Sequence, residues 1–174
     1  MVIVMIYYPI DPGAPFNVND LLLKMKGPFS SFFQVNETLE LCRHALWVTC
    51  EPSQLQQVLW NLVVNARAAI PHKGGITIES TGVSITNEYL ADHPDASVGP
   101  FVCLSVSDNG CGISAKDLPH IFEPFFFSSK SKVGLGLYFC REVARKCGGW
   151  IEVKTRLGHG STFSIFLPEV NPPK

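Results

Sequence analysis

The segment that most limits the possible folds is 103–112, which reads Cys-Leu-Ser-Val-Ser-Asp-Asn-Gly-Cys-Gly. Leu104 and Val106 alternate with small polar residues, which predicts a half-buried β-strand. Two glycines within three positions then allow a tight turn whose backbone can approach a flat or anionic group. Asp108, at the mouth of this turn, is an acceptor that can fix an amino donor. A plain hairpin is the alternative, because Asp-Asn-Gly is a favourable turn sequence.

Length and composition indicate one globular domain. The chain has 174 residues, 46% hydrophobic and 17% charged, with a mean hydropathy of +0.17. The formal net charge is −1 and there is no basic run, which argues against nucleic acid or an anionic membrane surface as a partner. The six cysteines show neither CxxC pairs nor metal-ligand spacing, so we expect buried, reduced thiols and a cytoplasmic location.

The first ten residues are apolar, but Asp11 makes this run too short to span a membrane. The run has no basic flank and no small-residue cleavage site, so we expect no signal peptide. We interpret residues 1–15 as an N-terminal extension or the edge of an excised fragment, and residues 16–170 as the domain itself.

Hydrophobic periodicity predicts alternating helices and strands. The first helix is expected to begin at Val18 and to be stopped by Gly27-Pro28. Two further helices are expected from Pro52 to Pro71 and from 134 to 147, with a helical turn at 117–119. Extended segments are expected over 32–41, 45–50, 76–85, 103–108, 150–155 and 161–167. The pattern favours an α+β fold, in which helices cover one face of a mixed or largely antiparallel sheet.

Asn61 and Asn65 are four residues apart on the long helix, so they share a face, and Gln57 extends the same polar row. The row flanks the apolar stripe of the helix, which predicts half-buried amides. An amide oxygen is a neutral, hard ligand that suits a Mg²⁺ ion already bound to phosphate oxygens. Structural asparagines that satisfy nearby backbone groups are the alternative.

Residues 134–137, Gly-Leu-Gly-Leu, open a predicted helix and form a second element able to bind phosphate. Glycines expose backbone N–H groups, and a helix N-terminus adds partial positive charge. Lys130 and Lys132 precede this element and can reach phosphate as point charges. The alternatives are an ordinary loop-to-helix junction and solvated surface lysines.

The run 121–127, Ile-Phe-Glu-Pro-Phe-Phe-Phe, is not typical of a packed strand and is too poor in glycine for a simple loop. Followed by a Ser/Lys-rich stretch, it favours a hinged lid whose aromatic rings pack down over a ligand. Ordinary core is the alternative.

In this order, the elements resemble the ATP-binding catalytic domain of sensor histidine kinases, within the wider group of Bergerat-fold ATPases. Residues 57–66 are similar to the N box of that family, 108–112 to the G1 box, 121–126 to the F box, 134–137 to the G2 box and 160–163 to the closing strand. The resemblance implies a two-layer α/β sandwich, with about three helices on one face of the sheet.

The resemblance also implies a role for each matching residue. Asp108 would accept the adenine amino group, and Thr162 would support the adenine site through water. Asn65 would hold Mg²⁺ with Asn61 beside it, and these two are the predicted catalytic residues. The lid would be anchored by Phe122, Phe125 and Phe126. Further predicted ATP-binding residues are Gly110, Gly112, Ile113, Phe122, Phe126, Lys130, Lys132, Gly134, Leu135, Gly136 and Leu137.

The family positions Mg-ATP for in-line transfer of the γ-phosphoryl group to a histidine. The implied function is that of the catalytic domain of a two-component sensor histidine kinase, with ATP and Mg²⁺ as cofactors. The implied partners are a histidine-bearing dimerisation domain and, indirectly, a response regulator. Nucleic acid and direct membrane contact are not expected.

Two departures from the family pattern matter. The phosphoacceptor segment, a histidine followed by an acidic residue on a dimerisation helix, is absent, so we expect that this chain is not a complete autokinase. The lid is short, because only three residues separate Lys130 from Gly134, and Lys132 and Val133 replace a common glycine and threonine.

Asn61 stands where hydrolysing relatives carry a glutamate base, and an amide cannot accept a proton at neutral pH. We therefore expect slow ATP hydrolysis. Two other functions stay open, a non-catalytic nucleotide-binding scaffold with a degenerate lid and a serine kinase that antagonises a sigma factor. The Phe-Glu-Pro-Phe-Phe run argues against the second.

Overall fold

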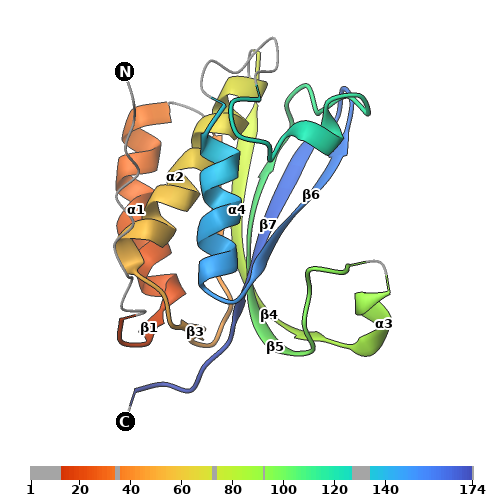
Figure 1. Ribbon diagram of the computed structural model, residues 1–174. Coiled ribbons are helices and arrows are strands. Elements are labelled where there is room, and N and C mark those ends of the chain that lie inside the picture. The colour runs from red at the N-terminus through yellow and green to blue at the C-terminus, as the bar shows by residue number, and fades with distance from the viewer. Residues whose placement is uncertain (1–12, 34–35, 72–73, 92, 127–133, 174) are drawn as a thin grey trace, which may run out of the picture.

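A computed structural model shows two layers, and it describes residues 13–33, 36–71, 74–91, 93–126 and 134–173. One layer is a five-stranded sheet. The other consists of the helices α1 (Val18–Phe33), α2 (Pro52–Ala69) and α4 (Gly136–Lys146), which pack side by side on one face of that sheet (Figure 1). The predicted α+β sandwich is therefore confirmed.

The sheet has the order β2-β4-β5-β7-β6 and is mostly antiparallel. Only the pairing of β2 with β4 is parallel among these neighbours. The strands are β2 (Asn36–Glu40), β4 (Gly75–Ile85), β5 (Gly99–Asp108), β6 (Trp150–Arg156) and β7 (Gly160–Pro168). The expected extended segment 45–50 pairs only at β3 (Trp47–Val48), with β1 (Phe16–Asn17).

The main core lies between the sheet and the helices. The apolar stripe of α2 is buried there, as its spacing predicted, at Leu55, Val58, Leu59, Leu62 and Ala66. Ala69, which the same spacing adds to the stripe, is only half-buried. A second, smaller cluster covers part of the opposite face of the sheet, beside the short helix α3 (Asn87–Leu90), which the sequence did not predict. That cluster comprises Ile85, Phe101, Cys103, Trp150 and Phe166.

The first helix extends further than the sequence predicted. The expectation that Gly27-Pro28 ends it was wrong, because α1 continues through Pro28 to Phe33. Phe29 is only 1% exposed, and its ring lies 5.5 Å from that of Trp60 in a stacked arrangement. The free energy gained by burying this ring exceeds the cost of the backbone hydrogen bond that Pro28 cannot donate. Residues 32–33, expected to be extended, are consequently helical.

We expect Pro28→Ala to raise the free energy of unfolding. Alanine restores an N–H donor toward the carbonyl of Lys24 and removes the ring from the helix interior. Proline costs about 3 kcal/mol there, part of which is offset because it restricts the unfolded chain, so the expected net gain is about 1–2 kcal/mol. Urea unfolding measures it, with Gly27→Ala as a control for helix propensity, since a Cβ there meets nothing within 4 Å. A loss of stability in Pro28→Ala contradicts this explanation.

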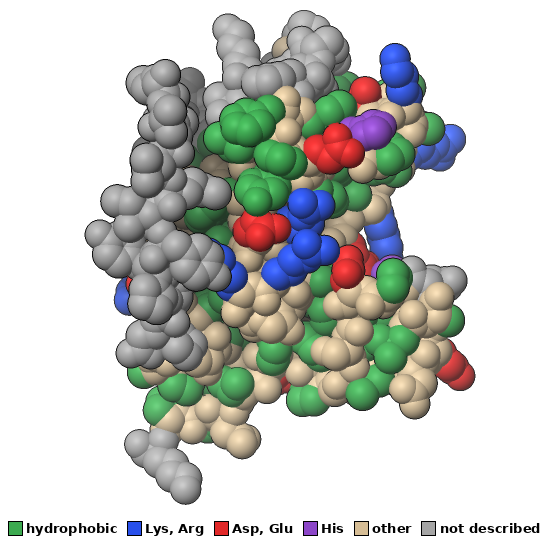
Figure 2. Space-filling view, viewed as in Figure 1, with side chains coloured by type: hydrophobic (Ala, Val, Ile, Leu, Met, Phe, Trp, Pro, Cys, Tyr) green, Lys and Arg blue, Asp and Glu red, His purple; other side chains and the backbone are tan. Residues whose placement is uncertain are grey.

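The outer surface of α4 carries charges of both signs, interspersed over the middle of the face that Figure 2 shows. Arg145 lies near Glu142 of the same helix and near Asp95 of the loop after α3, at 3.9 and 3.7 Å. No helix within the described ranges is both long enough and apolar enough to cross a membrane. All six cysteines are free thiols, of which Cys50, Cys103 and Cys140 are buried and the others half-buried.

Candidate nucleotide site

A cavity of about 270 Å³ opens at the end of the sandwich where β5 and α2 finish. Helix α2 contributes Asn65, Ala68 and Ala69 to its wall. Strand β5 and the loop that follows contribute Asp108, Cys111, Gly112, Ile113, Ser114, Asp117 and Ile121. The remaining wall is formed by Phe126, Gly134, Leu137, Leu157, Ser161 and Phe163. Most of this wall is apolar, so its few polar groups determine how a ligand is oriented in the cavity.

Asp108 lies on the helix-side face of the sheet. Leu104 and Val106 on β5 belong to the main core, and alternation of side chains places Asp108 on the same face. Its Oδ1 accepts a 2.8 Å hydrogen bond from the Gly110 N–H. Burial raises the pKa of the Asp108 carboxyl, and hydrogen bonds from the backbone N–H groups of Gly110 and Ser161 partly offset this.

The loop after β5 is held to its neighbours by backbone hydrogen bonds. The Cys111 N–H donates to the Ala69 carbonyl at 3.0 Å, and the Cys111 carbonyl accepts from Gly158 in the β6–β7 turn at 2.8 Å. The Ile113 N–H donates to Thr155 Oγ1 at 2.9 Å. Gly112 has a φ of +66°, and a Cβ there would collide with the backbone of Arg156. The loop is thus fixed before any ligand arrives.

Asn65 and Asn61 share one face of α2, as predicted, and both are half-buried. Only Asn65 reaches the cavity wall. Asn61 lies beside the start of α4, where its Cγ is 3.7 Å from the position of a Cβ on Gly136, and its Oδ1 accepts from Gln57 Nε2 at 3.2 Å. Gln57 itself is exposed, in contrast to the half-buried position that its row predicted.

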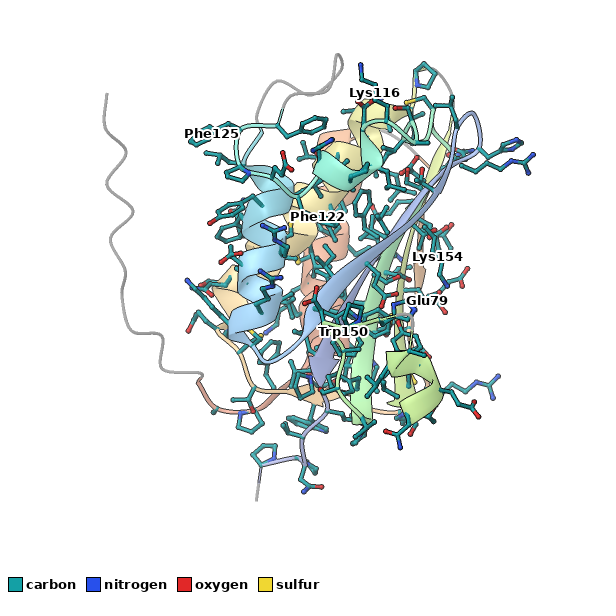
Figure 3. All side chains as sticks on the ribbon, turned by 45° about the vertical axis from the view of Figure 1, so that its right-hand side comes forward. Glu79, Lys116, Phe122, Phe125, Trp150 and Lys154 are labelled. Atoms are coloured by element: carbon teal, nitrogen blue, oxygen red, sulfur yellow. The ribbon has the colours of Figure 1, made fainter. Side chains whose placement is uncertain are left out.

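The aromatic run is divided between core and solvent. Ile121 is buried, and Phe122 and Phe126 pack against the main core. Phe125 is 65% exposed, and Figure 3 shows it at the outer edge of the molecule, so its ring does not pack on the core as those of Phe122 and Phe126 do. The Phe125 N–H donates to the Gly134 carbonyl at 2.8 Å, which holds the aromatic run beside the residues that precede α4. Lys130 and Lys132 lie outside the described residues.

The structure brings many predicted binding residues to one cavity and leaves others outside it. Asn65, Asp108, Gly112, Ile113, Phe126, Gly134 and Leu137 line the wall. Asn61, Gly110, Phe122, Leu135, Gly136 and Thr162 do not. Gly110 acts from behind the wall, through its hydrogen bond to Asp108, and has no room for a Cβ because the Ala69 carbonyl oxygen would be 2.5 Å away.

Thr162 lies on the wrong face for the role that the resemblance implied. Its hydroxyl is 2.9 Å from that of Ser107, on the face opposite the helices. Ser161, which pairs with Asp108 across β5 and β7, lines the cavity instead. Sequence reasoning missed Ser161 because the choice between neighbouring residues depends on strand register. The sequence offers one indication, because Ser161 is two residues from the buried Phe163 and therefore lies on the same face of the strand.

The oxygen donors at the cavity wall suit a cation that is bound mainly by the phosphates of a ligand. They do not form a metal site made of protein side chains alone. No cluster of three or more His, Cys, Asp or Glu side chains able to hold a metal occurs among the residues that the structure describes. Asn65 offers one neutral amide oxygen at the cavity wall. Mg²⁺ bound mainly by phosphates and water needs only one or two such protein oxygens.

Comparison with known proteins shows which family and which relatives this chain resembles. Residues 50–171 match the family described as histidine kinase-, DNA gyrase B- and HSP90-like ATPases. The sensor kinase CckA of Brucella abortus is 37% identical over 128 residues, which are 72% of this chain and 14% of that protein. The sensor histidine kinase ZraS of Salmonella typhi is 35% identical over 138 residues, 79% of this chain and 25% of that protein. The chain thus spans a quarter or less of these two relatives.

Solved structures share the same architecture. The nucleotide-free catalytic domain of histidine kinase ThkA aligns with a TM-score of 0.71 at 28% identity, covering 90% of this chain and 95% of that one. The mycobacterial sensor histidine kinase MprB aligns with a TM-score of 0.71 at 20% identity, covering 92% of this chain and 99% of that one. The second likeness concerns the fold alone.

Proposed function

The chain belongs to the family of histidine kinase-, DNA gyrase B- and HSP90-like ATPases, and we propose on this basis that it binds Mg-ATP for phosphoryl transfer to a histidine. It is a catalytic domain of the sensor histidine kinase type, and the acceptor histidine would lie on a separate dimerisation domain. A response regulator would receive the phosphoryl group next. The observation that carries this proposal is the half-buried carboxylate of Asp108 in the wall of a largely apolar cavity.

Asp108 would select adenine through the exocyclic amino group. One of its oxygens already accepts from Gly110, which fixes the orientation of the carboxyl group. A carboxylate carries about four lone-pair sites, so capacity remains for an amino donor. Apolar side chains of Ile113, Ile121 and Phe163 provide surface for a flat ring. Ser161, with its hydroxyl beside the same strand end, replaces Thr162 in this proposal.

The phosphates would lie toward α2 and the start of α4. Asn65 and Gly134 line that part of the wall, and α4 begins at Gly136, where the first backbone N–H groups of a helix have no acceptor within the helix and carry partial positive charge. Asn65 would hold Mg²⁺ through its amide oxygen. Bound Mg²⁺ supplies positive charge that neutralises charge developing on the transferring group.

Catalysis in this proposal consists of binding and orientation. The fixed loop after β5 positions the base, and the helix N-terminus positions the phosphates, so the γ-phosphoryl group is presented in line with an incoming imidazole nitrogen. No side chain in the cavity wall needs to form a covalent bond. The partner domain would supply the nucleophile.

A non-catalytic scaffold that only binds nucleotide is the second candidate. It is favoured by Phe125, which is 65% exposed although the resemblance implies that it anchors the lid. The two functions predict the same nucleotide binding but differ in phosphotransfer. The discriminating experiment mixes this chain with a histidine-bearing helical dimerisation domain and γ-labelled ATP. Label on the histidine supports the kinase, whereas saturable binding without transfer to any tested partner supports the scaffold.

We expect the domain to hydrolyse ATP slowly, and Asn61→Glu alone not to accelerate hydrolysis. Position 61 is not part of the cavity wall, and a glutamate there would accept from Gln57 Nε2 as Asn61 does, so its carboxylate would be held away from a water beside the γ-phosphate. Phosphate release over hours measures the rate. Asn61→Gln is the matched control, because it adds the same length without a proton acceptor. A rise of about tenfold or more in Asn61→Glu but not in Asn61→Gln, which is about 1.4 kcal/mol in the barrier, contradicts the expectation.

A further inference from the structure

Two hydroxyl groups meet at the end of the sheet that borders the cavity. Thr155 on the edge strand β6 pairs with Ser161 on β7, and the Oγ atoms of the two side chains are 2.9 Å apart. Ser161 is only 5% exposed and lines the cavity, whereas Thr155 is half-buried and is not part of the cavity wall. Thr155 can therefore influence a ligand only through its neighbours.

Thr155 Oγ1 has three hydrogen-bond partners in the structure. It accepts from the Ile113 N–H at 2.9 Å, donates to the Gly160 carbonyl at 3.1 Å, and contacts Ser161 Oγ. An N–H group can only donate and a carbonyl can only accept, so the single hydroxyl proton of Thr155 belongs to the contact with Gly160. Toward Ser161, Thr155 Oγ1 is therefore an acceptor.

The direction of the contact between the two hydroxyls follows from this assignment. Because the proton of Thr155 is already donated to Gly160, this contact is a hydrogen bond only if Ser161 donates its own proton to Thr155. The reverse direction would leave Thr155 Oγ1 and the Gly160 carbonyl as two acceptors 3.1 Å apart. Ser161 Oγ thus has no proton left for the cavity and presents only lone pairs to it.

Ser161 lies directly across from Asp108. The two residues are paired in the register of β5 and β7, and both line the cavity, so their side chains lie on the same face of the sheet. Directly opposite residues on one face have Cβ atoms about 5 Å apart. An ionised carboxylate only accepts hydrogen bonds. The cavity wall therefore holds two neighbouring acceptors, one charged and one neutral.

We propose that Thr155 is a positioning residue for nucleotide specificity, because it makes Ser161 an acceptor beside Asp108. This pair of acceptors selects purines that carry an exocyclic amino group. The amino group has two N–H donors, one for each acceptor, which it reaches directly or through a bound water. A purine without the amino group leaves both acceptors without that donor, which weakens its binding. The inference rests on the proposed function and adds a residue to it.

The test compares two nucleotides by calorimetric titration of the whole chain. They are ATP and purine riboside triphosphate, which lacks the amino group, and the ratio of their Kd values measures the amino-group preference. We expect Thr155→Val to lower this preference by about tenfold through weaker binding of ATP, because Ser161 regains a proton that opposes the amino donor. Thr155→Ser keeps the hydroxyl group and should keep the preference.

Ser107→Ala is the matched control for the loss of a hydroxyl group. Ser107 Oγ is 2.9 Å from Thr162 Oγ1, in a similar hydroxyl pair on the opposite face of the sheet, so this variant should also keep the amino-group preference. Valine is β-branched like threonine and suits a strand. Thr155→Ala is a second variant without the hydroxyl group, and it reports if Thr155→Val folds poorly.

Ser161→Ala separates the two routes by which Thr155 could act on the cavity. Thr155 also holds the Ile113 N–H, and Ile113 lines the cavity. When Ser161 is already alanine, Thr155→Val should leave the amino-group preference unchanged, because the acceptor that Thr155 controls is gone. A further fall of the preference in the double variant would mean that Thr155 acts through Ile113, and it would overturn the proposal.

Two other results would also overturn it. One is an unchanged amino-group preference in Thr155→Val. The other is an equal loss of affinity for both nucleotides, which a purely structural role predicts, because a loosened loop weakens the binding of both alike. Failure of the proposed function gives a different result, since the unsubstituted chain would then bind neither nucleotide saturably. A chain that prefers ATP, but keeps this preference in Thr155→Val, overturns only the role of Thr155.

Discussion

Replacement of Asp108 by asparagine is expected to abolish measurable ATP binding without unfolding the domain. The substituted amide can still accept from the backbone N–H groups that Asp108 uses, but its remaining group is an NH₂ donor that faces the donor on adenine. Loss of a charged acceptor and juxtaposition of two donors weaken binding by about 100-fold or more. Calorimetric titration with ATP and a non-hydrolysable analogue, with and without Mg²⁺, measures this.

Asp117→Asn is the matched control for this prediction. Asp117 also lines the cavity, but its Oδ2 accepts from Ser114 Oγ at 2.8 Å, in a turn that precedes the short helix Leu118–His120. An asparagine keeps that contact, so affinity should change by less than about threefold. Equal losses in the two variants would show that cavity charge, and not the carboxylate of Asp108, governs binding. Unchanged affinity in Asp108→Asn would remove the basis of the proposed function.

Asp108→Asn is also expected to change how the stability of the domain depends on pH. Because burial raises the pKa of Asp108 in the folded state, the folded protein binds its proton more tightly than the unfolded chain does. The carboxyl group therefore favours folding at low pH, and this contribution is lost as the pH rises through the folded-state pKa. Without nucleotide, Asp108→Asn should melt above the unsubstituted protein at neutral pH, and the difference should shrink toward acid pH.

Sequence reasoning succeeded where a residue's role depends on local pattern. The strand that ends at Asp108, the apolar stripe of α2 and the Gly-rich start of α4 follow from periodicity and from glycine positions, and the structure contains all three. Register within a strand is not local, because it depends on the partner strand. The resemblance implies Thr162 at the adenine site, whereas the pairing of β5 with β7 puts Ser161 in the cavity wall.

The other failures arise where tertiary packing opposes a local preference. Pro28 predicts a helix end, but the burial of Phe29 against Trp60 keeps α1 continuous. Phe125 is as apolar as Phe122 and Phe126, and only the turn of the backbone, with φ at +61° for Phe125, directs it to solvent.

Gly112→Ala is expected to destabilise the domain by about 2–5 kcal/mol, from two separable causes. The φ of +66° at this position costs an alanine about 1–2 kcal/mol. In addition, the new Cβ would collide with the carbonyl oxygen of Arg156, so the β6–β7 turn has to move and the hydrogen bond from Gly158 to Cys111 weakens. Urea unfolding, monitored through tryptophan fluorescence, measures the loss.

Gly158→Ala separates the two causes. Gly158 lies in the turn that Gly112 contacts and has a similar φ of +80°, yet a Cβ there meets nothing within 4 Å. Gly158→Ala should therefore lower the free energy of unfolding by only about 1–2 kcal/mol, because of the unfavourable backbone conformation. The additional loss in Gly112→Ala measures the close approach of the two loops. Equal losses would mean that the loop after β5 is free to move away from the turn. In that case its preformed shape could not fix the orientation of Asp108, and the cavity would have to be ordered by the nucleotide.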